Sequence, residues 1–193
     1  MRRPLAAVAV VLAVAATATA CNDNTKPADP AATGKGPAAQ APSAPAQGQG
    51  DGKSGAVGGK VTVKGNKPGE QLDVTLKNWA DPAKSDNKYT PPKPGKKYVA
   101  AEFEIVNTGT APYADSPQNS ASVIDAQGQK TNASTLASVA EGASLGADLK
   151  LAAGQKTTGW IVFTVPENDT VKTVQFAMNS GLASQPGQWA VKK

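Results

Sequence analysis

Short runs of alternating apolar and polar residues, separated by turn-forming residues, occupy the chain from about Lys60 onward. Successive side chains of a β-strand point to opposite faces, so a period of two with β-branched and aromatic residues predicts half-buried strands. The apolar positions of the clearest runs are Leu72, Val74 and Leu76; Val99, Ala101, Phe103 and Ile105; Ile161, Phe163 and Val165; and Val174, Phe176 and Met178.

The segments between these runs have turn chemistry, with glycine, proline, asparagine and aspartate recurring at short intervals. No long amphipathic helical pattern is present. Strands with frequent turns predict an all-β fold, a β-sandwich or barrel. The expected turns lie at residues 65–69, 91–95, 107–109, 125–128, 153–155 and 179–181.

Residues 131–150 depart from this pattern. Leu136, Val139, Ala140 and Ala143 have helical spacing, but glycines at 142 and 146 interrupt it. We expect a strand that continues into Ala137, followed by a loop or one helical turn.

The expected sandwich, residues 59–193, is long enough for one hydrophobic core. It contains no cysteine, so apolar packing rather than a disulfide must hold it together. The large core side chains are expected to be Phe103, Phe163, Phe176 and one or more of Trp79, Trp160 and Trp189.

The N-terminus has the pattern of a secretory leader. Arg2 and Arg3 precede an apolar run, Leu5 to Ala18, which is too short for a membrane-spanning helix. The small residues Ala18-Thr19-Ala20 lead directly to Cys21, the one cysteine of the chain. This arrangement resembles a bacterial lipoprotein signal, in which the cysteine thiol receives a diacylglyceryl group and becomes the new N-terminus.

Other interpretations of the leader remain open. Ala18-x-Ala20 also suits plain secretion, and the lipoprotein pattern usually has leucine where this chain has Ala18. Cys21 would then be a free or intermolecularly bridged thiol. The arginine pair also raises twin-arginine export, for which a bare pair is weak support.

Residues 21–58 are expected to be a disordered tether between the signal peptide, residues 1–20, and the sandwich. Apart from alanines and Cys21, this segment holds one apolar side chain, Val57, among scattered Pro, Gly, Gln and Ser. It cannot bury enough apolar surface to offset the entropy of ordering. A flexible chain of this length spans about 30–35 Å.

Three stretches of the expected sandwich resemble a domain of unknown function found in actinobacterial lipoproteins and often described as telokin-like. The domain is also similar to a small secreted mycobacterial antigen. The resemblance implies an immunoglobulin-like β-sandwich outside the cytoplasmic membrane and implies no activity. The stretches are residues 97–109, 113–117, and 151–154 leading to 159–166; the likeness covers about residues 59–191.

Catalytic chemistry has few candidates. The chain has no histidine, which removes the commonest general base near neutral pH, the Ser-His-Asp and Cys-His triads and the usual zinc sites. Glu102 and Glu104 lie two residues apart on one strand face and could serve glycoside hydrolysis, although a solvated outer face explains them more simply. We expect no enzyme, cofactor or metal site.

Two further motifs have simple explanations. Ser85-Asp86-Asn87-Lys88 matches both S-x-x-K and S-D-N, but the overlap prevents the two motifs from supplying separate catalytic groups. Asp115, Asp125 and Asp148 could offer oxygen ligands to calcium, yet no D-x-D-x-D-G loop is present, and aspartates of this kind often form turns.

The charge of the chain gives little support for binding to nucleic acid. Loss of Arg2 and Arg3 with the leader lowers the formal net charge from +5 to +3, without a basic stripe. Lys93, Lys96 and Lys97 could contact anionic wall polymer or lipid, but loop solubility and protection of a strand edge explain them more simply.

The alternation also raises an apolar outer patch as a candidate partner site, although a covered face is the favoured interpretation. If Ile161 and its alternate neighbours point inward, then Trp160 and Val162 point outward, and Tyr98 and Val106 do so on a neighbouring strand. Such a patch can mark a partner site. The alternative is that a loop or another strand covers this face, and tryptophan shielding would decide between them.

Taken together, these patterns favour a lipid-anchored protein on the outer face of a bacterial membrane, presenting a non-catalytic sandwich for binding or assembly at the envelope. Its partner would be the membrane through lipidated Cys21, and an envelope protein or wall polymer of unknown identity. The alternatives are a secreted enzyme or enzyme subunit with a carboxylate site, and a purely structural wall component.

Overall fold

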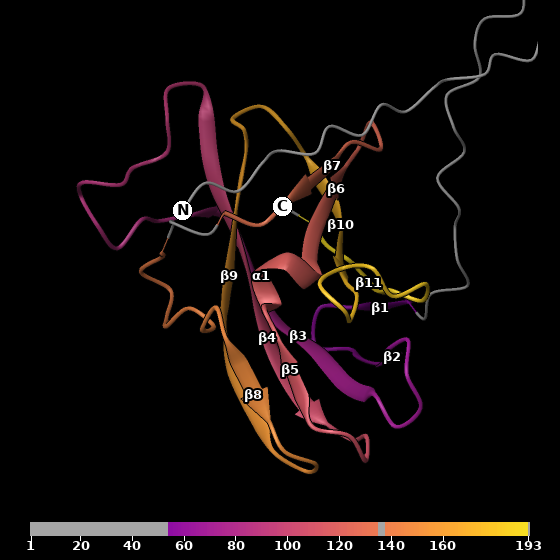
Figure 1. Cartoon of the computed structure of the whole chain (residues 1–193). Coiled ribbons are helices and arrows are strands. Elements are labelled where there is room, and N and C mark those ends of the chain that lie inside the picture. Colours follow the sequence, from indigo (N-terminus) through magenta and orange to yellow (C-terminus); the bar gives the residue numbers. More distant parts are fainter. Residues whose placement is uncertain (1–53, 135–137, 193) are drawn as a thin grey trace, which may run out of the picture. The chain divides into compact units, whose positions relative to one another are not determined.

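The computed structural model describes residues 54–134 and 138–192 (Figure 1). The expected signal peptide, Cys21 and most of the expected tether lie outside the described residues. The described residues form a β-sandwich, which confirms the predicted all-β fold. Among them, no helix is both long enough and apolar enough to cross a membrane.

Two sheets make the sandwich, and a small third sheet lies beside them. The five-stranded sheet has the order β1-β11-β10-β6-β7, the four-stranded sheet has the order β2-β3-β4-β9, and β5 pairs with β8. The elements are β1 (Ser54–Ala56), β2 (Lys60–Lys64), β3 (Gln71–Ala83), β4 (Lys96–Asn107), β5 (Tyr113–Asp115), α1 (Pro117–Ser120), β6 (Ala121–Asp125), β7 (Lys130–Asn132), β8 (Leu149–Leu151), β9 (Lys156–Pro166), β10 (Val171–Phe176) and β11 (Gly187–Ala190).

Period-two alternation places the core between the two large sheets, as expected. In the β3–β4 pair, Val74 lies opposite Ile105 and Leu76 opposite Phe103, and all four side chains are buried. Phe103 reaches across the sandwich to Phe176 and Trp189 of the other sheet, with ring centroids 5.6 and 5.8 Å away. The two sheets are therefore joined by tilted and edge-on aromatic contacts, which are favourable geometries for aromatic rings.

The outward side of the four-stranded sheet is covered, as the favoured alternative expected, so the candidate partner patch is not exposed. Tyr98, Trp160 and Val162 are buried in a second small apolar cluster with Ala83, Ala100 and Val139, and Val106 is half-buried. The alternation correctly predicted the side to which these residues point. It could not indicate that two loops cover that side.

The covering segments are anchored by backbone hydrogen bonds. Residues 143–145 run along the free edge of β9, where the Trp160 amide donates to the Ala143 carbonyl (2.9 Å) and the Leu145 amide donates to the Trp160 carbonyl (3.0 Å). Gly142 lies so close to the indole that a Cβ at this position would be 2.6 Å from Trp160 Nε1. The glycine that interrupts the helical spacing thus permits close packing on Trp160.

Two expected boundaries change. The strand expected to continue into Ala137 ends as β7 at Asn132, while Ala137 itself lies outside the described residues. Residues 138–148 form an irregular loop. The sandwich also includes residues of the expected tether, because Ser54–Ala56 form β1 and pair in parallel with β11.

Lys97 is not available to an anionic polymer, unlike Lys93 and Lys96, which are exposed. Its ammonium group lies 2.6 Å from Asp81 Oδ1 and donates to the Asp169 carbonyl at 3.0 Å. The two side chains of this ion pair retain 9% and 2% of their accessible surface. The pair is therefore part of the folded interior, where one ion cannot lose its partner without a large cost.

Phe103→Ala should lower the free energy of unfolding by about 3–5 kcal/mol, because it removes the aromatic contact between the sheets and leaves a cavity. Denaturant unfolding measures the effect. Val57→Ala, at an exposed position, is the control and should change stability by less than about 0.5 kcal/mol. An unchanged midpoint for Phe103→Ala would contradict the core described here.

Lys97→Met keeps most of the side-chain volume but leaves the Asp81 carboxylate buried without its cation, so the free energy of unfolding should fall by about 3–5 kcal/mol. The matched control is Lys96→Met at the neighbouring exposed position. Adding Asp81→Asn to Lys97→Met should recover part of the loss in thermal or chemical unfolding. Equal stabilities of the two lysine variants would show that the ion pair is energetically unimportant.

Candidate functional site

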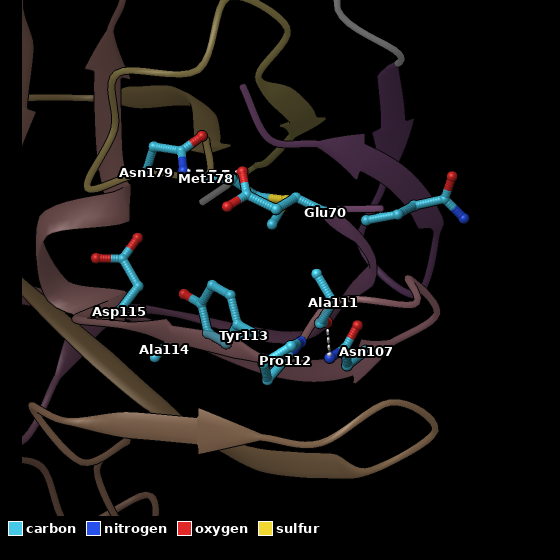
Figure 2. Close-up of a pocket in the computed structure, with 10 residues that line it drawn as sticks. Glu70, Asn107, Ala111, Pro112, Tyr113, Ala114, Asp115, Met178 and Asn179 are labelled. Carbon is cyan, nitrogen blue, oxygen red and sulfur yellow. Dashed lines mark hydrogen bonds between the residues drawn. The ribbon is translucent and has the colours of Figure 1, made fainter. Parts of the chain in front are cut away.

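A cavity of about 210 Å³ lies at one end of the sandwich (Figure 2). Its walls come from the turn before β3, the end of β4, the segment leading into β5, β5 itself and the turn after β10. Segments far apart in the sequence therefore meet around one space. The lining residues are Glu70, Gln71, Asn107, Ala111, Pro112, Tyr113, Ala114, Asp115, Met178 and Asn179.

Tyr113 provides a buried wall of this cavity. It begins β5, pairs with Leu151 of β8 and is only 5% exposed. Its hydroxyl has no hydrogen-bond partner among the described residues. Burial, and then the nearby Asp115 carboxylate, raises the pKa of Tyr113 well above its usual value. The nearby Ser120 hydroxyl acts in the opposite direction and lowers the pKa, although its position does not give a hydrogen bond to the Tyr113 hydroxyl.

Asp115 fixes the turn on the opposite side of the cavity. Its carboxylate accepts hydrogen bonds from the Ser180 amide and hydroxyl, both at 2.6 Å, from the Ser116 amide at 2.8 Å and from the Ser120 hydroxyl at 3.3 Å. These donors come from α1 with its N-cap, Ser116, and from the turn that follows β10. Asp115 therefore acts as a bridge between β5 and the turn that follows β10.

That turn has an uncommon backbone. Asn179 and Ser180 both have φ of 55° and Gly181 has φ of 85°, so three consecutive residues adopt the left-handed conformation. This conformation costs about 1–2 kcal/mol for each residue other than glycine. Hydrogen bonds from Ser180 to Asp115, and between Asn179 and the β2–β3 turn, offset that cost.

Glu70 completes the polar rim. Its Oε2 accepts hydrogen bonds from the Lys67 amide at 3.1 Å and from Asn179 Nδ2 at 3.2 Å. Among residues 54–134 and 138–192, neither Glu70 nor Asp115 forms an ion pair with a lysine or arginine. The cavity thus has two carboxylates whose negative charge is not balanced by a neighbouring cation in the described part of the chain.

The acids nominated from sequence do not meet in this cavity. Glu102 accepts a short hydrogen bond from Asn78, and Glu104 lies 3.8 Å from Lys156 Nζ, both on the outer face of β4. Asp125 accepts hydrogen bonds from the Gln127 and Gln129 amides, as expected for a turn-forming aspartate. Asp148 is exposed, and within the described ranges no group of three metal-ligating side chains gathers around it or elsewhere.

The overlapping Ser85-Asp86-Asn87-Lys88 motif forms an ordinary loop. The Ser85 hydroxyl donates to the Asn87 carbonyl at 2.9 Å, and the Asp86 carboxylate accepts from the Ser138 hydroxyl at 2.5 Å. The contact between Asp86 and Ser138 joins the two loops that cover the outer face of the sheet. The motif therefore stabilises the cover over the outer face of the sheet, in line with the interpretation of the match as a coincidence.

The cavity itself was not predicted from the sequence. The sequence pattern indicates no site role for Glu70 or Tyr113, and it predicts only a turn at residues 179–181. A tyrosine followed two residues later by an aspartate, Tyr113-Ala114-Asp115, was a usable local signal for one wall. Part of the opposite wall comes from Met178 and Asn179, more than 60 positions away, so no local pattern could have joined the two.

Raising the pH above about 10, the usual tyrosine pKa, should destabilise the protein through Tyr113. The folded state raises the pKa of this phenol, so the unfolded chain loses the proton first and is favoured as the pH rises. In denaturant titrations at alkaline pH, Tyr113→Phe should therefore lose less free energy of unfolding than the wild-type protein. The exposed Tyr89 supplies the control, since Tyr89→Phe should follow wild type; a parallel decline of all three proteins would refute the role of Tyr113.

Comparison with known proteins places the chain in a family without an assigned activity. The secreted protein MPT63 of Mycobacterium tuberculosis is similar in structure, with a TM-score of 0.53, 16% identity and coverage of 72% of this chain and 98% of that chain. The yjhA protein of Bacillus subtilis is also similar, with a TM-score of 0.49, 14% identity and coverage of 72% and 99%. No curated protein is a detectable match. The family described as "Domain of unknown function (DUF4352)" matches residues 68–186, more than half of the sequence, and the chain therefore belongs to that DUF4352 family.

Proposed function

We propose that this protein is a lipid-anchored binding protein of the bacterial cell envelope, whose sandwich holds a ligand without converting it. The observation that carries the binding role is the cavity beside Tyr113, where two carboxylates and a buried hydroxyl converge. Concave sites lined by apolar side chains and a few convergent polar groups are the usual form of ligand sites.

The chemistry of the cavity supports binding rather than turnover. Asp115 and Glu70 hold their places through hydrogen bonds to turn residues, and Tyr113 keeps its proton because its pKa is raised. A nucleophile would need an adjacent base, and none of these groups is arranged to take a proton from another. The pair Glu102 and Glu104 lies on the outer face of β4, apart from the cavity.

The location rests on the leader and on the attached segment. Two acyl chains on Cys21 would hold the protein stably on a bilayer, whereas one chain gives only marginal binding. MPT63, which has the same fold, is a secreted protein. A segment of the length of residues 21–53 would then allow the sandwich to reach about 30 Å from the lipid surface.

Cys21→Ala should release the protein from the membrane fraction into the soluble or culture fraction, because the residue that would receive the diacylglyceryl group is gone. Fractionation and immunoblotting measure the distribution. Ala18→Leu is a matched leader variant that keeps Cys21 and brings the leader closer to the usual lipoprotein pattern, so it should remain bound. Retention of Cys21→Ala in the membrane at the wild-type level would refute the anchor.

A further inference from the structure

The cavity beside Tyr113 is negatively charged in a protein whose formal net charge is +5. Glu70 and Asp115 lie on its two sides, and in the described part of the chain neither is paired with a cation. In this partly enclosed space a charge is screened less than on open surface. The electrostatics therefore favour a cationic group as the occupant.

The size of the cavity limits that occupant. A volume of about 210 Å³ equals roughly seven water molecules of liquid volume, and ligand pockets for drug-sized molecules usually begin near 300 Å³. One extended side chain or small amine fits, whereas an oligosaccharide does not. Met178 and Ala111, together with the ring of Tyr113, supply apolar walls for a short aliphatic stem (Figure 2).

The Tyr113 hydroxyl is a second and independent indication of a ligand. It belongs to a side chain 95% removed from solvent and has no partner among the described residues, although buried hydroxyls normally form hydrogen bonds. In Figure 2 the hydroxyl of Tyr113 points toward the side of the cavity where Asp115 lies. A hydroxyl can accept one N–H from an ammonium group.

A metal ion suits this site less well. Calcium takes six to eight oxygen ligands at short range, whereas no group of three acidic side chains gathers within the described ranges. The Asp115 oxygens already accept four hydrogen bonds. An ammonium group can donate its hydrogen bonds to Glu70 and Tyr113, and the charge of Asp115 can still attract it without supplying a further lone pair.

We infer that the cavity binds a primary ammonium group on a short aliphatic stem, as on a lysine-type side chain of a peptide ligand, with Glu70 and Asp115 as counter-ions and Tyr113 as hydrogen-bond acceptor. This inference rests on the proposed binding function and specifies its ligand class. It makes Glu70 the cleanest residue to test, because a glutamine side-chain oxygen can still accept from the Lys67 amide and Asn179.

The test titrates n-pentylammonium chloride into the mature full chain and follows backbone amide shifts by NMR. Saturable shifts should appear at Tyr113, Asp115 and residues 179–181, and they should weaken as salt is raised. Neutral n-pentanol, of similar size and shape, should cause much smaller shifts. Equal binding of the alcohol, or shifts confined to another part of the sandwich, would overturn the inference.

Glu70→Gln should weaken n-pentylammonium binding about tenfold, the effect of losing one charge-assisted hydrogen bond. Glu102→Gln removes an acid outside the cavity and should bind as wild type does. Tyr113→Phe gives a second cavity variant, also expected to bind less well, if Glu70→Gln fails to give a folded amide spectrum. Wild-type affinity in both cavity variants, or calcium-induced shifts of the same amides that exclude the amine, would refute the ammonium site.

The proposed ligand class and the proposed membrane anchor can be refuted independently. Amine binding by a protein that stays soluble with an intact Cys21 would overturn the location and leave the ligand class standing. A membrane-bound protein with no affinity for n-pentylammonium would overturn the ligand class and leave the anchor standing.

Discussion

Apolar packing between two sheets, without a covalent link, is the constraint on which the rest of this molecule depends. Phe103 contributes from one sheet, and Phe176 and Trp189 contribute from the other. All three side chains are fully buried. Since the sandwich has no cysteine, the strands that carry the polar rim segments depend on these aromatic contacts to hold the two sheets together.

The four-stranded sheet is buried on both faces over part of its area, which is less common for an antiparallel sheet than burial on one face. Its inner face meets the aromatic core, and its outer face meets the cluster of Tyr98, Trp160 and Val162. The same outer face is polar farther along β4, where Glu102 and Glu104 stand. The covered part is held by apolar packing, while the rim at the cavity depends on hydrogen bonds that side chains such as Asp115 accept.

The strands and turns could be predicted because their signals are local. Alternation in β3, β4 and β9 and the glycine and proline of the hairpin loops act within a few residues. The segments that cover Trp160 could not be identified, because alternation gives the direction of a side chain and not what lies above it. A hint was present in Tyr98-Val99-Ala100-Ala101, an unbroken apolar run of the kind found in strands buried on both faces.

Burial of Lys97 and assembly of the cavity depend on tertiary pairing that no single segment encodes. In the sequence, Lys97 resembles the exposed loop lysines Lys93 and Lys96. It is buried because it forms an ion pair with Asp81 of the neighbouring strand. The bond between Asn179 and Glu70 joins residues 109 positions apart. Sequence spacing predicts neighbours on one element, whereas such contacts are determined by the order of strands in the sheets.

The pairing of β1 has a mechanical consequence for a chain held at its N-terminal end. Ser54, Gly55 and Ala56 are the only residues of β1, and they pair in parallel with Gln188, Trp189 and Ala190. Tension that enters through the preceding residues is therefore applied first to a three-residue ladder. The next hydrogen bonds along the chain run from the Gly58 amide to the Leu76 carbonyl of β3 and from Trp189 Nε1 to the Gly59 carbonyl, both 2.7 Å long. Pulling force would therefore reach both sheets next to the aromatic centre before it reaches the distal loops.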